Sequence, residues 1–150
     1  MPNNKLPISV NICVLNEGDN IRLCIESVIK NNPKEIIVVD GGSTDNTIDV
    51  LSEYPITIIN SKKSGLSTQR QLAIDNSSET YIAIVDGDDI LEPDFLSVLV
   101  NEIEEYDFDA LQGREVSYDA KGYFEKAMGA VNSQITFHNK PKDCLLYTSD

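Results

Sequence analysis

Three carboxylates stand within four residues in the segment Asp86-Gly87-Asp88-Asp89. Carboxylates this close repel one another when they are unpaired, so ionising all of them is costly. A divalent cation removes that cost, because hard cations favour oxygen ligands, and Gly87 leaves room for a ligand near the backbone. Alternatively, Asp88 or Asp89 caps a following helix. The segment by itself supports a metal site or a capping turn.

A second polar turn follows an apolar run that ends at Asp40. The turn has the sequence Gly41-Gly42-Ser43-Thr44-Asp45. A carboxylate at such a place can accept a hydrogen bond from a base N–H or from a ribose hydroxyl. The same residues also suit a helix cap with turn glycines, in which Thr44 or Asp45 is the cap. The turn matches neither the dinucleotide-binding glycine pattern nor a phosphate-binding loop.

An arginine, the single histidine and the cysteines are further residues that could bind a ligand or a metal. Arg70 stands in a predicted helix soon after Gly65, where it could contact phosphate or a carboxylate, although a solvated surface charge is the alternative. The single histidine, His138, lies in a region without a pattern and receives no role. The three cysteines have no zinc-like spacing. Cys13 and Cys24 stand among apolar residues, so we expect buried, reduced thiols.

Four short apolar runs rich in β-branched residues predict buried strands. They cover residues 8–15, 35–40, 56–59 and 81–85. Residues 110–118 could form a further strand, and residues 133–150 show no element. The runs are too short to span a membrane.

Apolar residues at helical spacing predict a helix after each of the four strands. Asp19 is the expected N-cap of the first helix. The third helix is expected over residues 66–76, with Leu66 on its inner face together with Ala73 and Ile74. Pro93 is expected in the first turn of the fourth helix, because proline suits that position.

The alternation of strands and helices predicts an α/β fold: a mostly parallel sheet flanked by helices on both faces. Ligands of such sheets bind outside the carboxyl ends of the strands, near a switch in strand order. Three polar turns follow strand ends, at residues 16–17, 40–44 and 86–89. All three should therefore lie on one edge of the sheet, and this convergence predicts a binding site there.

The composition of the chain limits the classes of ligand that could bind at that site. The chain has 150 residues, enough for one ordinary domain, and 41% of them are hydrophobic. Its formal net charge of -13 repels nucleic acid and anionic membranes over long range. An acidic protein that binds an anionic nucleotide needs a local positive charge to offset the repulsion, such as a metal ion. No signal peptide is visible at the start of the chain, so we expect a cytoplasmic protein.

Taken together, residues 8 to 114 resemble the amino-terminal part of family 2 glycosyltransferases, which have the GT-A fold, a Rossmann-like α/β architecture. The resemblance rests on five segments in the expected order. These are the first strand with Asn16-Glu17, residues 38–45, Gly65-Leu66-Ser67 leading to Arg70, residues 81–89, and Pro93-Asp94-Phe95-Leu96.

The resemblance implies a nucleoside diphosphate sugar as donor, with UDP-sugars favoured, and Mg²⁺ or Mn²⁺ as cofactor. It implies that Asp88 is the metal ligand that bridges the diphosphate. Asp40 would contact the base, and Asp86 would lie near the ribose and the metal. Arg70 would lie near the nucleotide and order the acidic loop. The implied nucleotide-sugar-binding residues are therefore Leu15, Glu17, Asp40, Arg70 and Asp86.

The sequence departs from the family pattern in two places. Gly41 follows Asp40 where many members have a second acid. The family's catalytic base lies beyond the metal motif, and residues 116–150 contain no matching Glu-Asp pair, which leaves Glu115 and Glu125 as candidates only by default. We expect residues 1–115 to form the nucleotide-sugar- and metal-binding half. Residues 116–150 would begin the acceptor side of a truncated GT-A domain, incomplete at its carboxyl end, with residues 144–150 artefactual.

These implications lead to two hypotheses. In the first, the parent protein is an inverting, hexosyltransferase-type enzyme of cell-wall or polysaccharide biosynthesis, in the cytoplasm or at the cytoplasmic face of the membrane. It would act on an unknown saccharide, lipid or protein acceptor, and this fragment itself would transfer poorly. In the second, the chain is a non-catalytic nucleotide- or metal-binding α/β module. A transferase half should prefer a nucleoside diphosphate over free phosphate.

Overall fold

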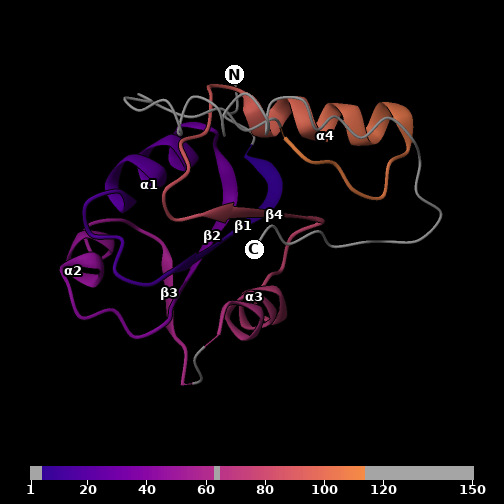
Figure 1. Cartoon of the computed structure of the whole chain (residues 1–150). Coiled ribbons are helices and arrows are strands. Elements are labelled where there is room, and N and C mark those ends of the chain that lie inside the picture. Colours follow the sequence, from indigo (N-terminus) through magenta and orange to yellow (C-terminus); the bar gives the residue numbers. More distant parts are fainter. Residues whose placement is uncertain (1–4, 63–64, 114–150) are drawn as a thin grey trace, which may run out of the picture. The chain divides into compact units, whose positions relative to one another are not determined.

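The computed structural model describes residues 5–62 and 65–113. The chain divides into two compact units, Met1–Ser97 and Val98–Asp150, and the sheet lies in the first. Strands and helices alternate along the described residues (Figure 1). In chain order they are β1 (Leu6–Val14), α1 (Ile21–Lys30), β2 (Pro33–Asp40), α2 (Thr47–Leu51), β3 (Thr57–Asn60), α3 (Leu66–Asp75), β4 (Tyr81–Asp86) and α4 (Phe95–Tyr106).

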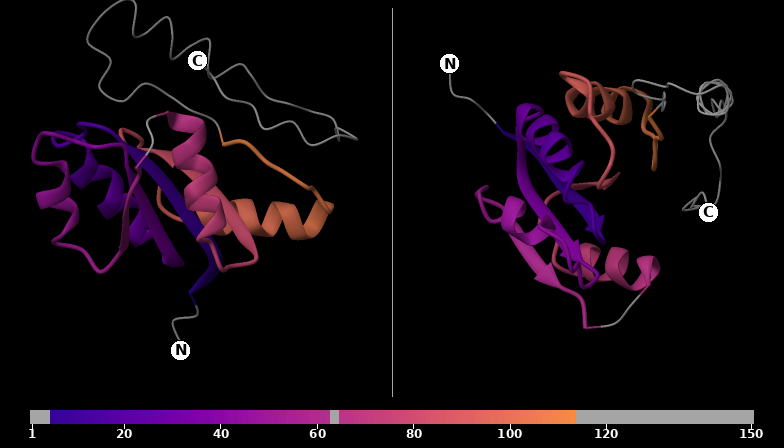
Figure 2. Two further views of the ribbon diagram at one scale, coloured as in Figure 1. Left: turned by 90° about the horizontal axis from the view of Figure 1, so that it is seen from below. Right: turned by 60° about the vertical axis from the view of Figure 1, so that its left-hand side comes forward.

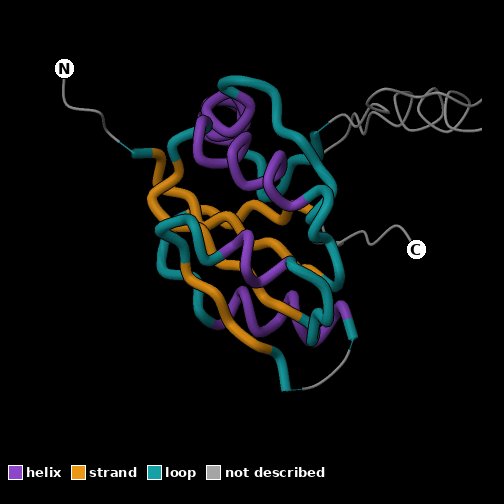
Figure 3. The backbone as a smooth tube through the Cα atoms, turned by 90° about the vertical axis from the view of Figure 1, so that its left-hand side faces the viewer, coloured by secondary structure: helices purple, strands orange, loops and turns teal. Residues whose placement is uncertain are grey.

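The four strands form one parallel sheet in the order β3-β2-β1-β4. Figure 3 shows them as a single layer with helices on both sides. The chain steps from β1 through β2 to β3, then returns across the sheet to place β4 on the free side of β1. The strand order therefore reverses between β1 and β4. The expected α/β fold with a parallel sheet is confirmed.

The core lies where apolar strand residues meet apolar helix stripes. The middle of β1 is buried on both faces, because α1 and α2 cover one face and α3 covers the other (Figures 1 and 2). In β1 the fully buried apolar residues include Val10 and Ile12, and in α1 they include Ile21, Ile25 and Val28. A central strand buried on both faces explains the continuous apolar run in its sequence.

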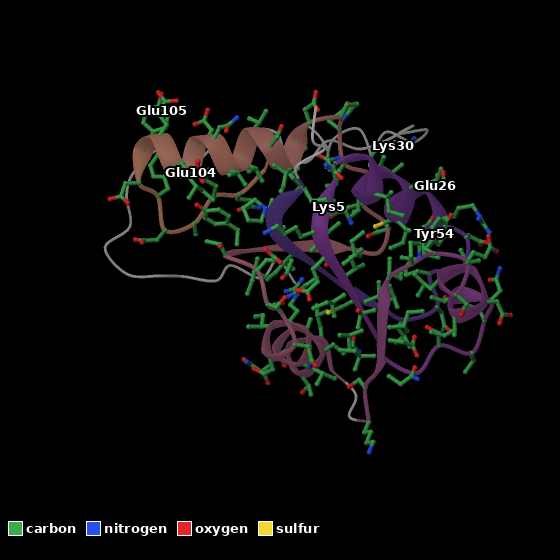
Figure 4. The ribbon with its side chains drawn as sticks, turned by 180° about the vertical axis from the view of Figure 1, so that it is seen from behind. Lys5, Glu26, Lys30, Tyr54, Glu104 and Glu105 are labelled. Carbon is green, nitrogen blue, oxygen red and sulfur yellow. The ribbon has the colours of Figure 1, made fainter. Side chains whose placement is uncertain are left out.

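A surface network ties α1 to the segment that follows α2. The guanidinium of Arg22 donates to both carboxylate oxygens of Glu53, each at 2.8 Å. The hydroxyl of Tyr54 donates to Glu26 at 3.0 Å, and these two side chains lie beside each other in Figure 4. The Arg22–Glu53 ion pair is solvent-exposed, so it fixes geometry more than it adds stability.

Three expectations about the helices are wrong. Asn20 rather than Asp19 is the N-cap of α1, because the carbonyl of Glu17 accepts the N–H groups of both Asn20 and Ile21 and starts the helix there. Leu66 is 47% exposed, because the inward row of α3 runs through Gln69 and Ala73 instead. Pro93 precedes α4, separated from it by Asp94, whose φ of 63° is left-handed and cannot continue a helix.

Other differences concern boundaries. β2 begins at Pro33, two residues before the expected start, because Pro33 pairs with Leu6 of β1. The described part of the expected strand at 110–118, residues 110–113, is not a strand, and residues 114–118 lie outside the described residues. No helix in the described part of the chain is both long and apolar enough to cross a membrane.

Candidate functional site

The three polar turns meet at one edge of the sheet, as expected. Val14 of β1 pairs with Asp40 of β2, and Cys13 of β1 pairs with Asp86 of β4. The carboxyl ends of these three strands are therefore level, with β1 in the middle. The turns that follow β1 and β4 border the point where the strand order reverses, which is where open α/β sheets bind ligands.

The turn after β1 is joined to the turn after β2 by hydrogen bonds across 27 to 30 residues of sequence. Asn16 adopts a φ of 58°, a left-handed conformation that asparagine tolerates, and this directs its side chain towards Thr44. These hydrogen bonds connect the two turns into one rigid rim. Its bonds run from Asn16 N to Ser43 Oγ (2.9 Å), Thr44 N to Asn16 Oδ1 (2.8 Å), Glu17 N to Thr47 Oγ1 (2.9 Å) and Gly18 N to Asp45 Oδ2 (3.0 Å).

Asp40 is enclosed by its own turn. Its residue is 3% exposed. The N–H of Gly42 donates to Oδ2 at 3.0 Å, and the N–H and hydroxyl of Ser43 donate to Oδ1 at 3.1 and 2.5 Å. A carboxylate has about four acceptor positions, and most of them are used here. Asp40 is thus placed at the expected edge, with its carboxylate engaged in holding the turn.

Asp86, which ends β4, is open in comparison. Its side chain is 54% exposed, and Oδ1 accepts a 3.2 Å hydrogen bond from Nη2 of Arg70. The Arg70 side chain is 18% exposed, and its Nε is buried with no hydrogen-bond partner among the described residues. The structure therefore brings the predicted residues Arg70 and Asp86 together, and it leaves one guanidinium donor free.

Asp88 and Asp89 have different surroundings in the same turn. The side chain of Asp89 closes the turn, because its Oδ2 accepts the N–H of Asp86 at 3.2 Å. Asp88 is exposed, and no hydrogen bond or ion pair of its carboxylate is found within the described residues. Neither residue caps α4, which begins six residues later at Phe95. Helix capping therefore does not account for Asp88.

Gly87 lets this turn lie against the end of β1. A Cβ at this position would stand 3.0 Å from Cγ1 of Val14 and 3.1 Å from Cγ of Glu17. Any larger residue would push the acidic turn away from the turn after β1. The glycine thus lets the turn that carries Asp86 and Asp88 pack against the carboxyl end of β1.

The donor set fits a divalent cation that is shared with a ligand. Among the residues that the structure describes, no group of three or more acidic, histidine or cysteine side chains could hold a metal ion by itself. Mg²⁺ and Mn²⁺ usually need only one or two carboxylates when substrate phosphates supply the rest. Asp88 and Asp86 could provide those carboxylates, and the free donor on Arg70 suits an anion.

Leu15 and Glu17 lie on the rim formed by the first turn. Leu15 is 54% exposed, an unusual position for a leucine beside polar turns. The carboxylate of Glu17 accepts a 3.2 Å hydrogen bond from Nδ2 of Asn20, and its backbone N–H is held by Thr47. Both residues stand at the predicted edge. The roles assigned to all six predicted site residues remain predictions.

The cysteine nearest the site is not a thiolate. Burial raises the pKa of Cys13 to about 11, partly offset by Arg70, and Asp86 raises it further. Burial, followed by the carboxylates of the acidic turn, raises the pKa of Cys24 to about 12. Both thiols are thus protonated at neutral pH. Cys24 is buried as expected, whereas Cys13 is only half-buried.

Gln69 was missed by the sequence analysis. It is 6% exposed, and a Cβ at Gly41 would stand 2.3 Å from its Nε2. The buried amide therefore takes the space that a side chain at position 41 would need. This packing favours glycine at position 41. A polar residue on the inward side of a predicted helix was the available signal, but the expected face of α3 centred on Leu66 instead.

Comparison with known proteins identifies the group to which this fold and site belong. The model of the glycosyl transferase family 2 matches residues 9–148. Glycosyltransferase GlyA of Streptococcus pneumoniae serotype 4 is 34% identical over 125 residues, which is 78% of this chain and 18% of that protein. The chain thus spans less than a fifth of this relative's length.

Solved structures share the fold. The crystal structure of S. aureus TarS superposes with a TM-score of 0.70 over 78% of this chain and 23% of TarS, at 24% identity. Glucosyl-3-phosphoglycerate synthase from Mycobacterium tuberculosis, in complex with Mg²⁺ and UDP, superposes with a TM-score of 0.51 at 27% identity, covering 64% and 38% of the two chains. The expected GT-A architecture is confirmed, and the chain belongs to glycosyl transferase family 2.

Proposed function

We propose that this chain is the donor-binding part of a metal-dependent, inverting glycosyltransferase of the hexosyltransferase type that uses a UDP-sugar. The observation that carries the proposal is the exposed pair Asp86 and Asp88 at the end of β4, beside the reversal of strand order. Arg70 approaches this pair with a spare buried donor. Carboxylates and a guanidinium at that place suit a metal-bound diphosphate.

Each side chain of the acidic turn would have a separate task. Asp88 would ligate Mg²⁺ or Mn²⁺, and the cation would neutralise charge that develops on the leaving diphosphate. Asp86 would hold the ribose side of the nucleotide while Arg70 keeps its carboxylate in place through the 3.2 Å contact. Asp89 would keep the turn closed by accepting the N–H of Asp86.

The rim of the first two turns would receive the nucleoside. The exposed side chain of Leu15 offers an apolar surface for the base or ribose, and Glu17 borders it. Asp40 would contact the base from the floor of the site through an acceptor position that its own turn leaves unused. A relative with the same fold has been crystallised with UDP and Mg²⁺, which supports a uridine nucleotide.

Transfer also needs an acceptor and a base that removes the acceptor's proton. The default candidates Glu115 and Glu125 lie outside the described residues, as do residues 144–150. Because residues 116–150 contain no Glu-Asp pair that matches the family's catalytic base, we propose that this chain binds donor and metal but transfers sugar slowly or not at all. Its parent would act in cell-wall or polysaccharide synthesis, in the cytoplasm or at the cytoplasmic face of the membrane, on a saccharide, lipid or protein acceptor.

Calorimetric titration of UDP into the 150-residue chain tests the donor site. Titrations would be made with Mn²⁺ and with EDTA, on the wild type, on Asp88→Asn and on a matched control, Asp75→Asn. Asp75 is an exposed aspartate at the far end of α3, and asparagine there can still accept the hydrogen bond from Gln71. Both variants remove one negative charge, so only the position of that charge differs.

We expect Mn²⁺ to strengthen UDP binding by at least tenfold, and Asp88→Asn to abolish that gain while Asp75→Asn keeps it. Inorganic phosphate should compete poorly, because it lacks the nucleoside. A folded wild-type chain that does not bind UDP in the presence of Mn²⁺ would contradict the proposal. Equal binding of phosphate and UDP would favour a metal-binding module without transferase chemistry.

A further inference from the structure

Three side chains of α1 interrupt its apolar stripe with groups that can form hydrogen bonds. They are Cys24, Ser27 and Asn31, the last of which is the C-cap residue, and we call them the α1 row. Their spacing of three and four residues places them on one face of the helix. All three are buried, with exposures of 0%, 6% and 5%. Buried polar groups need partners, so the row must bond to a neighbouring part of the chain.

Among the described residues, the partners of the row outside α1 lie in residues 86–96, from the last residue of β4 to the start of α4. Four hydrogen bonds connect the row to the backbone of this stretch, so side chains of one helix hold a loop that is more than 60 residues away in sequence. The bonds join the Cys24 thiol to Asp86 O (3.5 Å), Leu91 N to Ser27 Oγ (3.0 Å), Asn31 Nδ2 to Glu92 O (3.1 Å) and Leu96 N to Asn31 Oδ1 (3.0 Å).

The stretch needs these bonds, because residues 87–94 form neither helix nor strand. Its backbone groups therefore have no ladder to join. The row itself is held firmly. Ser27 donates to the carbonyl of Cys24 at 2.7 Å, and Asn31 donates to the carbonyl of Ser27 at 3.0 Å. A rigid row can fix a loop that would otherwise move.

The opposite side of the acidic turn, residues 86–89, is fixed by steric contact. Gly87 lies so close to Val14 and Glu17 that not even a methyl group would fit without displacement. The turn thus packs closely against β1 on that side, and movement away from α1 is resisted by the bonds of the row. The raised pKa of Cys24, caused by burial and then by the carboxylates of Asp89, Asp88 and Asp86, agrees with this closeness.

We propose that the α1 row positions the acidic turn and thereby sets the metal-dependent affinity for a nucleoside diphosphate. Ser27 and Asn31 are positioning residues, since they act through the backbone of residues 86–96 and touch no ligand. The inference rests on the proposed donor site for its effect on binding. Its effect on the acidic turn follows from the hydrogen bonds alone.

The chain offers a matched pair of serines for the test. Ser27 donates to the carbonyl of the third residue before it and accepts the N–H of Leu91. Ser77 accepts a hydrogen bond from Asn11, and its hydroxyl lies within donating distance of the Ala73 carbonyl, four residues before it, and of Oδ1 of Asn11. Ser27→Ala and Ser77→Ala each remove local and long-range bonds, but only Ser27 bonds to the stretch that directly follows the acidic turn.

Two measurements would be made on the wild type and both variants of the 150-residue chain, well below their melting temperatures. The first is the ratio of the UDP dissociation constants in EDTA and in Mn²⁺. The second is hydrogen exchange of the backbone amides of residues 86–92. A lower folded fraction would change neither the ratio nor the order of exchange rates among segments, so both measurements separate positioning from loss of stability.

We expect Ser27→Ala to lower the Mn²⁺ ratio about tenfold, as loss of an outer-shell partner does in metal sites, and to speed exchange of residues 86–92 about tenfold. Ser77→Ala should change both by less than about twofold. The inference fails if Ser27→Ala leaves exchange of the acidic turn unchanged, or if Ser77→Ala speeds it equally. A wild type without metal-dependent UDP binding would overturn the proposed function, whereas the exchange rates would still decide the positioning.

Discussion

Two aspartates end the strands on either side of β1, and they serve in opposite ways. Asp40 ends β2, is 3% exposed, and accepts hydrogen bonds from Gly42 and Ser43 of its own turn. Asp86 ends β4, has a side chain that is 54% exposed, and forms an ion pair with Arg70. Both are placed at the same edge by the same kind of strand. The turn that follows decides whether such a carboxylate supports the fold or is available to a ligand.

The free energy of unfolding should separate the two aspartates most strongly. Asp40→Ala removes a buried carboxylate and the hydrogen bonds to it that hold its turn, so we expect a loss of about 3 kcal/mol. Asp86→Ala removes an exposed ion pair and should cost less than about 1 kcal/mol. Urea denaturation of the two variants measures both values. Equal losses would show that the two turns do not differ in this way.

Metal-dependent nucleotide binding should rank the carboxylates in the reverse order. For the gain in UDP affinity caused by Mn²⁺, we expect about a hundredfold loss in Asp88→Asn and about a tenfold loss in Asp86→Asn. Asp40→Asn should leave the gain unchanged in the folded protein, because its carboxylate faces its own turn. Calorimetry on the three variants gives the ranking. A larger loss in Asp40→Asn than in Asp88→Asn would refute it.

The packing of the turn after β2, which encloses Asp40, also depends on Gln69. Gly41→Ala would force its methyl group against the buried amide, and we expect a loss of about 1–2 kcal/mol. Much of this loss should disappear when Gly41→Ala is measured in the background of Gln69→Ala. As a control, Gly42→Ala has free space but a φ of 99°. Its cost is backbone strain, so Gln69→Ala should not relieve it.

The smallest expected effect is a pKa change in the rim that joins the first two turns. The hydroxyl of Thr47 donates to Asp45 and is the main cause that lowers the pKa of this carboxyl. A lowered pKa stabilises the fold above the ordinary value of 3.8, and this contribution is lost as the pH falls through the lowered value. Thr47→Val should move the pKa of Asp45 upward in a carbon-detected NMR titration. An unchanged pKa would assign the shift to another contact.

The positions of the site residues were largely predictable, whereas their surroundings were not. Leu15, Glu17, Asp40, Asp86 and Asp88 all lie at the predicted edge of the sheet. Which strands flank β1, and hence which turns adjoin it, was not predictable from strand patterns alone. The α1 row had a visible signal, since Ser27 and Asn31 lie on an apolar stripe. No feature of the sequence indicated where the hydrogen-bond partners of these side chains lie.

The amino-acid sequence by itself determined the alternation of strands and helices and the placement of three polar turns at one edge. These features depend on periodicities that span only a few residues and on the rule that parallel strands end together. Only the tertiary structure decided that Asp40 is enclosed, that Asp86 meets Arg70, and that α1 holds the acidic turn. The Asp86–Arg70 pair and the bonds from α1 depend on contacts across 16 to 65 residues, and strand register and helix packing, rather than local pattern, bring such residues together.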